Sequence, residues 1–336
     1  MPTVIKKIED QKEWDRFVND KASPSIFHLW KFLKIIEKHT KYELLPYGIY
    51  KGDELLSIIP LFYKEILSVK VLFSPPPLTA IPYMGLLIDK DFINFKQSKK
   101  DRYIYTISEE LCNKIEEIKP DYCSICLFPN LTDIRYFKNK NYFVDTNYTY
   151  ITKLNEDLND IWSKIDKGVR NKINTQEKID IEEIQDASIV YKSIEQRYKD
   201  QKINLPIICE DYLSDLKKEF PDNVKIRIAK NNGEIIGSEI VLCYRNVVWD
   251  WLGGSKPQTK IPVNEILKWN MIEDYKKKNF NELDYVGANN EKISTFKVKF
   301  EPELQSYFRI QKNNIKGSII EFLYFNFVKK DGFIQI

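Results

Sequence analysis

The pattern of hydrophobic and polar positions occurs twice along the chain. In the first half, residues 47–62 (YGIYKGDELLSIIPLF) form two β-rich runs separated by a Gly-containing turn. In the second half, residues 226–242 (IRIAKNNGEIIGSEIVL) do the same. Runs rich in β-branched and aromatic residues, interrupted by such a turn, are typical of β-hairpins. The sequence therefore predicts one hairpin in each half.

Similar elements flank both hairpins. Helices are expected before each hairpin, and a strand, a further helix and a last strand after it. The expected helices are 13–18, 30–39, 102–119, 187–199, 210–219 and 264–279, and the expected strands outside the hairpins are 69–73, 122–128, 247–252 and 282–286. The same order in both halves predicts an α/β chain with two similar lobes.

The two lobes are connected by an expected strand at 142–154, after which residues 155–178 have the character of a basic helix. We therefore expect an N-terminal lobe at 1–154 and a C-terminal lobe at 155–336. The tail, about 317–336, is aromatic and apolar, so we expect it to pack against another part of the chain. The first lobe is the candidate.

Composition narrows the classes of function. The 336 residues include 52 Lys and Arg against 49 Asp and Glu, a net charge of +3. No global field attracts polyanions such as DNA, so any anion must bind at a local patch. The sequence begins without the apolar region of a secretion signal and has no run of about 18 uncharged apolar residues. We expect a cytoplasmic protein without a transmembrane segment.

Histidines and cysteines are few. The only histidines are His28 and His39, which argues against a Ser-His-Asp triad or a zinc site. Cys123 and Cys126 form a C-x-x-C inside a strand-like apolar run without a turn, so we interpret them as small buried hydrophobes. No Gly-rich phosphate loop of Walker or dinucleotide type occurs. These features disfavour a metalloenzyme, a redox enzyme or a Ser-His hydrolase.

Four segments of the second half carry a family resemblance. They are IWSKIDKGVRNKINTQEKIDI (161–181), WDWLGGS (249–255), LDYVGAN (283–289) and FKVKFEPELQSY (296–307). In this order they resemble the Fem-type aminoacyltransferases, which add amino acids to peptidoglycan precursors, and the wider GNAT-like acyltransferase superfamily. The resemblance implies an α/β (α+β) fold of two tandem GNAT-like lobes. Each lobe is expected to have a mixed, mostly antiparallel sheet flanked by helices, and the C-terminal lobe to hold the donor site.

Two departures from that pattern leave the donor open. Between Asp180 and Asp211 there is no room for the helical arm of tRNA-using members. The segment KPQTKIPV (256–263), where an acetyltransferase cradles coenzyme A pyrophosphate, has no glycine and two prolines that lack an N–H. We expect no tightly bound cofactor, and the acyl donor is either aminoacyl-tRNA or acyl-CoA.

Two residues are candidates for catalysis. The resemblance assigns Lys297 to the donor side, near the carrier phosphates and the developing oxyanion, although a Lys-rich chain has many surface lysines. Asp250 lies between two tryptophans in a strand. It is a candidate base for the incoming amine if it faces inward with a partner, or a solvated side chain if it faces outward.

Five further residues are candidates for substrate binding. Lys167 and Arg170 lie three apart on one helical face, as a phosphate or carboxylate clamp requires, although such faces are often merely solvated. Tyr285 and Asn289 flank a glycine at a strand end. Their polar groups either orient a substrate or have only a structural role, in the core and in the turn. Tyr83 belongs to a proline-stiffened loop of the first lobe that is expected to border the cleft.

The prediction is an acyltransferase that moves an acyl or aminoacyl group from a carrier, tRNA or CoA, to an amine of a cell-envelope precursor or related metabolite. One alternative is an acyl-CoA-dependent N-acetyltransferase of the GNAT superfamily. Another, of a different class, is a catalytically silent binding module on the same fold.

Overall fold

The computed structural model describes residues 2–174, 178–200, 207–256 and 259–323 of the chain. It divides into two compact units, each of which is described by itself. Unit 1 comprises the described residues of 1–147 and 306–330, and unit 2 comprises those of 148–305. The chain therefore passes from unit 1 to unit 2 and returns.

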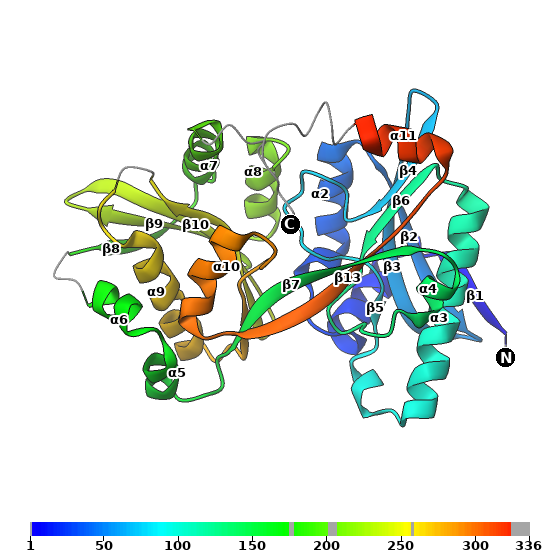
Figure 1. Ribbon diagram of the computed structural model, residues 1–336, viewed down its shortest axis with the longest axis horizontal. Helices are drawn as coiled ribbons and strands as arrows, with labels where there is room; N and C mark the ends of the chain where they lie inside the picture. The colour runs from blue at the N-terminus through cyan, green and yellow to red at the C-terminus, as the bar shows by residue number, and fades with distance from the viewer. Residues whose placement is uncertain (1, 175–177, 201–206, 257–258, 324–336) are drawn as a thin grey trace. The chain divides into compact units, whose positions relative to one another are not determined.

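Unit 1 is a mixed sheet covered by helices (Figure 1). Its strand order is β1-β2-β3-β4-β6-β13, with β5 paired to β3; β4 and β6 are parallel, and the other assigned pairs are antiparallel. The strands are β1 Thr3–Lys7, β2 Glu43–Lys51, β3 Glu54–Ile66, β4 Val69–Ser74, β5 Leu87–Ile88, β6 Tyr122–Cys126 and β13 Glu303–Asn313. The helices are α1 Gln11–Arg16, η1 Phe17–Lys21, η2 Ile26–His28, α2 Trp30–Thr40, η3 Lys90–Asn94, α3 Gln97–Ile118, α4 Arg135–Asn139 and α11 Ile315–Leu323.

The core of unit 1 follows from the apolar spacing of its longest helix. In α3, Ile104, Ile107, Leu111 and Ile115 recur every three or four residues and are all buried against the sheet. Such spacing places them on one stripe of the helix, and burying that stripe stabilises both elements. Strand β3 is buried on both faces over most of its length, as expected for an interior strand of the sheet.

Unit 2 has the strand order β7-β12-β11-β10-β9-β8, in which only the described pair β11–β12 is parallel. The strands are β7 Phe143–Lys153, β8 Asp180–Ile184, β9 Val224–Asn231, β10 Glu234–Tyr244, β11 Val247–Ser255 and β12 Glu282–Asp284. The helices are α5 Leu158–Lys164, α6 Lys167–Ile173, α7 Ser188–Asp200, α8 Glu210–Glu219, α9 Val263–Lys277, α10 Glu291–Lys297 and η4 Val298–Phe300. Helices α7 and α8 cover one face of the sheet and α9 the other (Figure 1).

The mixed α/β fold and both hairpins are confirmed. The first hairpin turns at Gly52 and the second at Asn232 and Gly233, all with positive φ. The compact units divide inside strand β7, between Asn147 and Tyr148, whereas the sequence predicts a division after Leu154. Described residues of the expected tail form α11, which packs against β4 and β6 of unit 1. Residues 324–336 lie outside the described part.

An irregularity between β10 and β11 positions the residues discussed below. The pairing register shifts between Ile240, which faces Leu252, and Val241, which faces Asp250, so that Trp251 is the extra residue. A bulge of this kind bends the strand and redirects its side chains. Trp251 packs its ring 6.3 Å from that of Tyr212 on α8, while Asp250 is directed to the α9 side, where it contacts Lys268.

Gly253 is required where β10 and β11 approach each other. A Cβ at Gly253 would lie 2.4 Å from the Cα of Glu239, and its φ is +136°. We expect Gly253→Ala to lower the free energy of unfolding by about 2 kcal/mol or more, because both backbone strain and a backbone clash oppose it. Gly233→Ala is the matched control, since its φ is +83° but nothing lies within 4 Å, and it should cost about 1 kcal/mol. Urea denaturation measures both, and equal losses would contradict the close approach.

Candidate functional site

The candidate site lies where β11 and β12 separate. These strands are parallel from Val247 with Glu282 to Trp249 with Asp284, and their pairing ends there. The next residues along the two strands are Asp250 and Tyr285. Because the strands run in the same direction, both residues lie beyond the same end of the pair.

Asp250 is inward-facing and has a partner. Its Oδ2 contacts the Nζ of Lys268 on α9, and the two side chains are 10% and 9% exposed. The Lys268 Nζ also lies 5.9 Å from the ring centroid of Tyr285. A buried carboxylate needs such a cation, since an unpaired charge away from water is costly. Lys268 was not predicted as a site residue, because its role depends on pairing with Asp250 in the folded structure.

Lys297 binds the backbone that follows β12. Its Nζ donates to the carbonyl oxygens of Tyr285 at 2.5 Å, Val286 at 2.9 Å and Gly287 at 2.8 Å. An ammonium has three N–H donors, and here all three are used by one turn. The turn needs this support because Val286 and Gly287 have φ values of 52° and 83°. In this conformation Lys297 therefore stabilises the turn from Tyr285 to Gly287 through its three hydrogen bonds.

Burial lowers the pKa of Lys297 to about 8. The negative charge of Asp250 opposes this shift, and the positive charge of Lys268 adds to it. The two lysines and the aspartate are therefore electrostatically coupled, although Lys297 forms its hydrogen bonds with carbonyls. A lysine in this range exists partly as the neutral amine near pH 8.

A second set of hydrogen bonds holds the same turn from β7. Thr149 Oγ1 donates to Asp284 Oδ1 at 2.5 Å, and the backbone N–H of Val286 donates to the same oxygen at 2.8 Å. The N–H of Gly287 donates to Thr149 Oγ1 at 3.2 Å. The segment from Asp284 to Gly287 is thus fixed by side chains of β7 and α10.

Tyr285 and Asn289 are both placed by β7. The Tyr285 ring is fully buried, and its hydroxyl accepts from Thr152 Oγ1 at 3.2 Å. Asn289 Oδ1 accepts the N–H of Tyr148 at 2.8 Å, while its buried Nδ2 has no hydrogen-bond partner among the described residues. Tyr285 therefore serves the core, whereas Asn289 keeps a donor available.

A buried Arg–Glu pair beneath α9 was missed from the sequence. Arg227 on β9 faces Glu239 on β10, with Nε 3.5 Å from Oε1, and both side chains are almost fully buried. The Arg227 guanidinium also contacts Asn270 on α9. Burial raises the pKa of Glu239 to about 7, against the opposing charges of Arg227 and Lys268. The available signal was a glutamate inside the apolar run of β10.

The two predicted clamp residues differ in environment. Both belong to α6, whose N-cap is Asp166. Lys167 is exposed, whereas Arg170 is half-buried and its Nε has no hydrogen-bond partner among the described residues. Neither forms a hydrogen bond or ion pair with Asp250 or Lys297 within the described part of the chain. Helix α6 instead packs on α9, where Lys172 pairs with Glu265 at 2.7 Å.

The loop between β11 and α9 is braced by side chains. Asn264 Oδ1 accepts the N–H of Ser255 at 2.8 Å, which joins the end of β11 to the start of α9. Arg197 on α7 donates from Nη1 to the Gly253 carbonyl at 2.9 Å. A Cβ at Gly254 would lie 2.1 Å from the same Nη1. A cation is therefore positioned at this loop, in which residues 257 and 258 lie outside the described part.

Tyr83 belongs to the core of unit 1. It is 2% exposed, and its ring lies 5.1 Å from that of Phe128, 5.4 Å from Tyr307 and 6.2 Å from Phe27. The histidine beside this cluster, His28, is buried and bound to Ser25 at 2.7 Å, and burial lowers its pKa to about 4. These contacts support the packing of unit 1.

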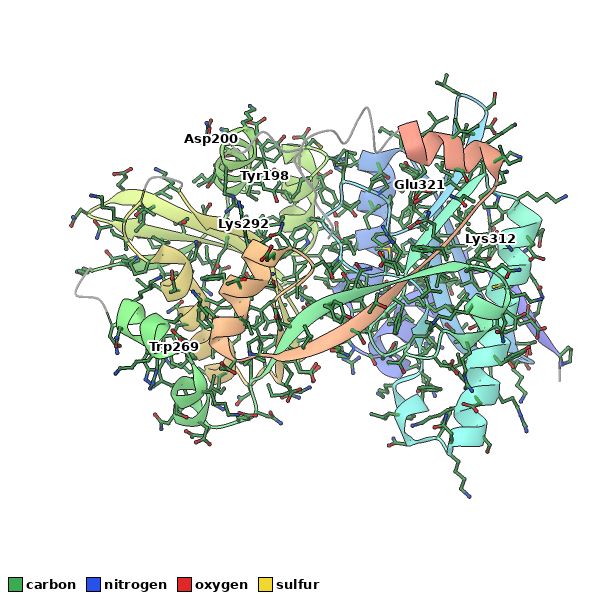
Figure 2. The ribbon with its side chains drawn as sticks, viewed as in Figure 1. Tyr198, Asp200, Trp269, Lys292, Lys312 and Glu321 are labelled. Carbon is green, nitrogen blue, oxygen red and sulfur yellow. The ribbon has the colours of Figure 1, made fainter. Side chains whose placement is uncertain are left out.

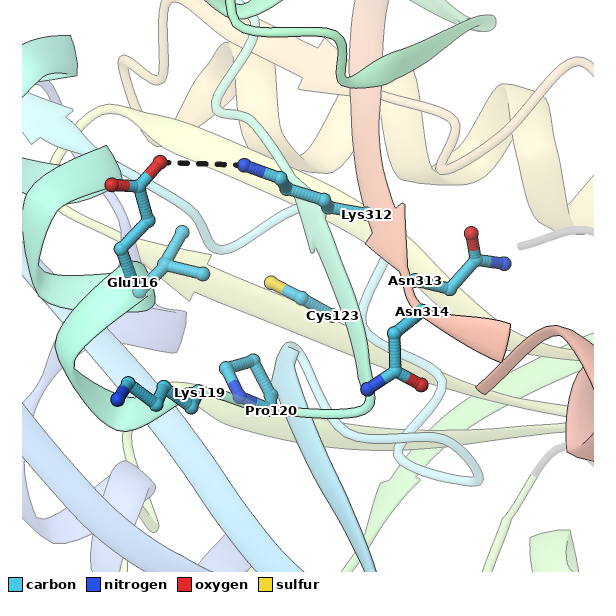
Figure 3. Close-up of a pocket in the computed structure, with 8 residues that line it drawn as sticks. Glu116, Lys119, Pro120, Cys123, Lys312, Asn313 and Asn314 are labelled. Carbon is cyan, nitrogen blue, oxygen red and sulfur yellow. Dashed lines mark hydrogen bonds and ion pairs between the residues drawn. The ribbon is translucent and has the colours of Figure 1, made fainter. Parts of the chain in front are cut away.

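None of the predicted site residues lines either of two cavities among the described residues. One of about 230 Å³ lies in unit 1 between the end of α3 and the end of β13 (Figure 3). It has Cys123 among its lining residues, whose thiol pKa burial raises, and Lys312 paired with Glu116 at 3.4 Å. One of about 60 Å³ lies in unit 2 beside Thr152 and Phe300.

The described residues hold no group of three or more His, Cys, Asp or Glu side chains arranged to bind a metal ion. Within the same residues, no helix combines the length and apolar character needed to span a bilayer.

A sequence comparison finds a family model that matches most of the second unit. The profile described as acetyltransferase (GNAT) domain matches residues 162–297, from α5 to the lysine that holds the turn. This segment is similar to GNAT acetyltransferase domains. A search of curated proteins finds no match.

Solved structures show the same fold over the whole chain. FemX is 9% identical with a TM-score of 0.71, and the match covers 96% of this chain and 99% of that one. L-PGS from Bacillus licheniformis is 12% identical with a TM-score of 0.55, and 96% and 98% are covered. A tandem GNAT protein from the clavulanic acid biosynthesis pathway is 8% identical with a TM-score of 0.51, and 93% and 98% are covered.

These findings confirm the Fem-type and GNAT-like resemblance and the fold of two GNAT-like lobes. The match over residues 162–297 supports an acyltransferase activity for the chain. At identities this low, the solved structures establish the fold, whereas donor and acceptor have to be argued from the residues of this chain.

Glu239 should make stability depend on pH. Its folded pKa of about 7 exceeds the ordinary value of 4.5, so the stability that it contributes is fully present below about pH 4.5. That contribution is lost as the pH rises to about 7, at roughly 1.4 kcal/mol per pH unit. Glu239→Gln should remove this dependence, and Glu234→Gln, at an exposed position, should not. Chemical denaturation between these pH values measures it, and identical profiles for wild type and Glu239→Gln would contradict the assignment.

Proposed function

We propose that the protein transfers an acyl or aminoacyl group from a carrier bound by unit 2 to an amine of a cell-envelope precursor or related metabolite. The carrier is a tRNA or coenzyme A. The observation that carries the proposal is the group formed by the buried pair Asp250–Lys268 and the half-buried Lys297 at the separation of β11 and β12. It lies inside the segment that matches the GNAT domain. GNAT lobes bind their acyl donors where such strands separate.

In the proposed reaction, the amine nitrogen attacks the acyl carbonyl carbon. The bond to the carrier breaks, an ester C–O bond for tRNA or a thioester C–S bond for coenzyme A. Asp250 takes the proton that the amine loses, and the released carrier oxygen or sulfur takes a proton in turn. Lys268 compensates the charge of the Asp250 carboxylate, with which it is in contact.

The remaining residues are assigned to binding and positioning. Lys297 holds the turn from Tyr285 to Gly287, on which the acyl group rests, and its positive charge favours the developing oxyanion. Asn289 offers its free Nδ2 to the substrate. Arg197, which was missed from the sequence, and the exposed Lys167 are assigned to the carrier phosphates.

The proline-containing loop after β11 supports a donor other than acetyl-CoA, because it offers fewer backbone N–H groups for a pyrophosphate. The alternative of an acyl-CoA-dependent N-acetyltransferase rests on the GNAT match itself. A silent binding module is disfavoured by the buried charges of Asp250 and Lys268, which a structure without chemistry has little reason to keep out of water.

Binding of acetyl-CoA and of charged tRNA to the purified protein, measured side by side by calorimetry, tests the proposal. Saturable binding of charged tRNA alone supports aminoacyl transfer, and saturable binding of acetyl-CoA supports the acetyltransferase alternative. Binding of neither, together with no release of the acyl group from either donor, would overturn the proposal and favour the silent module.

Lys297→Met should lower kcat/KM about 100-fold with the donor that binds, because the turn at Tyr285–Gly287 loses its cation. Lys292→Met is the matched control, since Lys292 lies on the same helix with its side chain exposed (Figure 2). It should change kcat/KM less than about twofold. Thermal unfolding of both variants separates a loss of fold from a loss of turnover. Undiminished turnover in folded Lys297→Met would rule out this assignment.

Asp250→Asn keeps the shape of the side chain but removes the base. We expect kcat to fall about 100-fold with little change in donor affinity. If donor affinity fell and kcat did not, Asp250 would belong to binding.

A further inference from the structure

Unit 1 contains a strand separation of the same kind as the candidate site of unit 2. Its strands β4 and β6 are parallel, from Val71 with Tyr122 to Ser74 with Ile125, and their pairing ends there. The parallel pair β11–β12 of unit 2 ends in the same way beside Asp250. Beyond such an end the two strands no longer bond to each other, so a segment or a ligand can lie between them.

In unit 1 the chain itself returns to this separation. After the excursion that begins at Pro75, residues 79–88 are all buried. A buried segment with little regular structure is uncommon, because its backbone N–H and C=O groups need partners away from water. The partners of residues 79–88 therefore show where the segment is held.

On the side of β6, the segment is held by its backbone. The N–H groups of Met84 and Gly85 both donate to the Cys126 carbonyl, at 3.0 and 2.8 Å. Cys126 directly follows Ile125, the last residue of β6 that pairs with β4. A Cβ at Gly85 would lie 2.9 Å from the Cys126 carbonyl oxygen and 2.9 Å from the Leu127 Cα. The segment thus lies against β6 just beyond the separation, so closely that a side chain at position 85 would displace it.

On the side of β3, the segment continues the sheet. Leu87 and Ile88 form β5, which pairs antiparallel with Ile58 and Ser57 of β3. Strand β4 also pairs antiparallel with β3, at residues 62–66. Strand β5 therefore runs along β3 in the same direction as β4 and occupies the place beyond its end. The Ser57 hydroxyl donates to the Leu87 carbonyl at 2.9 Å and fixes this position.

The connection into the segment has two residues in backbone conformations that L side chains rarely adopt. Leu78 and Ala80 have φ values of 63° and 55°. Such conformations persist where the surrounding structure determines them. Here they turn the chain back into unit 1, and Thr79 Oγ1 supports the turn by donating to the Pro76 carbonyl at 2.8 Å.

Side chains complete the closure of the separation. His28 Nε2 lies 3.2 Å from the Gly85 carbonyl oxygen. Because burial lowers the pKa of His28 to about 4, this histidine is neutral near pH 7. Met84 and Leu86 are fully buried. Neither of the two cavities described above has a residue of 79–88 in its lining.

The separation in unit 2 has a different composition. Strand β11 itself continues beyond Asp250 to Ser255, paired with β10. The side chains gathered at the separation are the pair Asp250–Lys268 and the half-buried Lys297. Unit 2 therefore presents charged groups at the position that unit 1 fills with an apolar segment of its own chain.

We propose that residues 79–88, called the plug, close the strand separation of unit 1, so that each chain takes up one acyl donor and takes it up in unit 2. A donor that entered unit 1 in the same manner would have to displace the plug, which would break its backbone hydrogen bonds and expose buried residues to water. The closure of unit 1 stands on the contacts of the plug. The number of donors per chain also rests on the proposed function.

Hydrogen exchange, measured by mass spectrometry on peptides that cover residues 79–88, tests the closure without a donor. We expect the amides of the plug to exchange at least about 1000-fold more slowly than in an unfolded chain, because they open only with the core of unit 1. The turn at Leu67, whose side chain is 95% exposed, is the internal reference and should exchange rapidly. Exchange of the plug as fast as that of this turn would overturn the closure.

Gly85→Ala should loosen the plug, because the added Cβ would meet the backbone of Cys126 and Leu127. Exchange of the plug should become at least about tenfold faster. Leu78→Ala is the matched control, since Leu78 lies in the same connection, is 44% exposed and is outside the plug, so exchange of the plug should not change. Unchanged exchange in Gly85→Ala would contradict the close approach on which the closure depends.

Isothermal titration calorimetry of the wild type with acetyl-CoA and with charged tRNA counts the donors. We expect about one donor per chain for the donor that binds, and no change in the exchange of the plug when it is bound. Two donors per chain, or faster exchange of the plug in the presence of the donor, would overturn the proposal. Binding of neither would overturn the proposed function and with it the number of donors, whereas the exchange experiment decides the closure in either case.

Discussion

Unit 2 depends on one constraint: charged side chains that are buried beneath α9 must find partners inside the protein. Asp250 and Lys268 are buried beside each other and Lys297 is half-buried near them, and each needs partners because a charge withdrawn from water is costly. Lys268 supplies the partner of Asp250, and three carbonyls supply those of Lys297. The position of α9, the bulge at Trp251 and the left-handed turn after β12 all serve these contacts.

Burial of charged groups also affects both the stability of unit 2 and its capacity for proton transfer. A lysine whose burial lowers its pKa to about 8 and a glutamate whose burial raises its pKa to about 7 change charge near neutral pH. Groups of this kind cluster at functional sites, because proton transfer is efficient when the pKa lies near the working pH. Unit 1 has no comparable group among the residues discussed: its buried His28 is neutral at such pH, and its tyrosines pack in the core.

The two units therefore divide the work in our interpretation. Unit 2 matches the GNAT profile and buries the charges proposed for acyl transfer. Unit 1 contributes a packed aromatic core.

The sequence by itself determined the α/β fold and both hairpins, because these depend on local periodicity. Its family resemblance suggested Lys297, and the place of Asp250 between two tryptophans suggested that residue. It did not reveal Lys268, Glu239 or Arg227, since their importance arises from burial and pairing between elements far apart in the chain. It also could not show that Tyr83 packs into a core or that Leu67 projects into solvent. An apolar residue has the same appearance in a sequence in either case, and only the packing of the neighbouring elements decides which surface is covered.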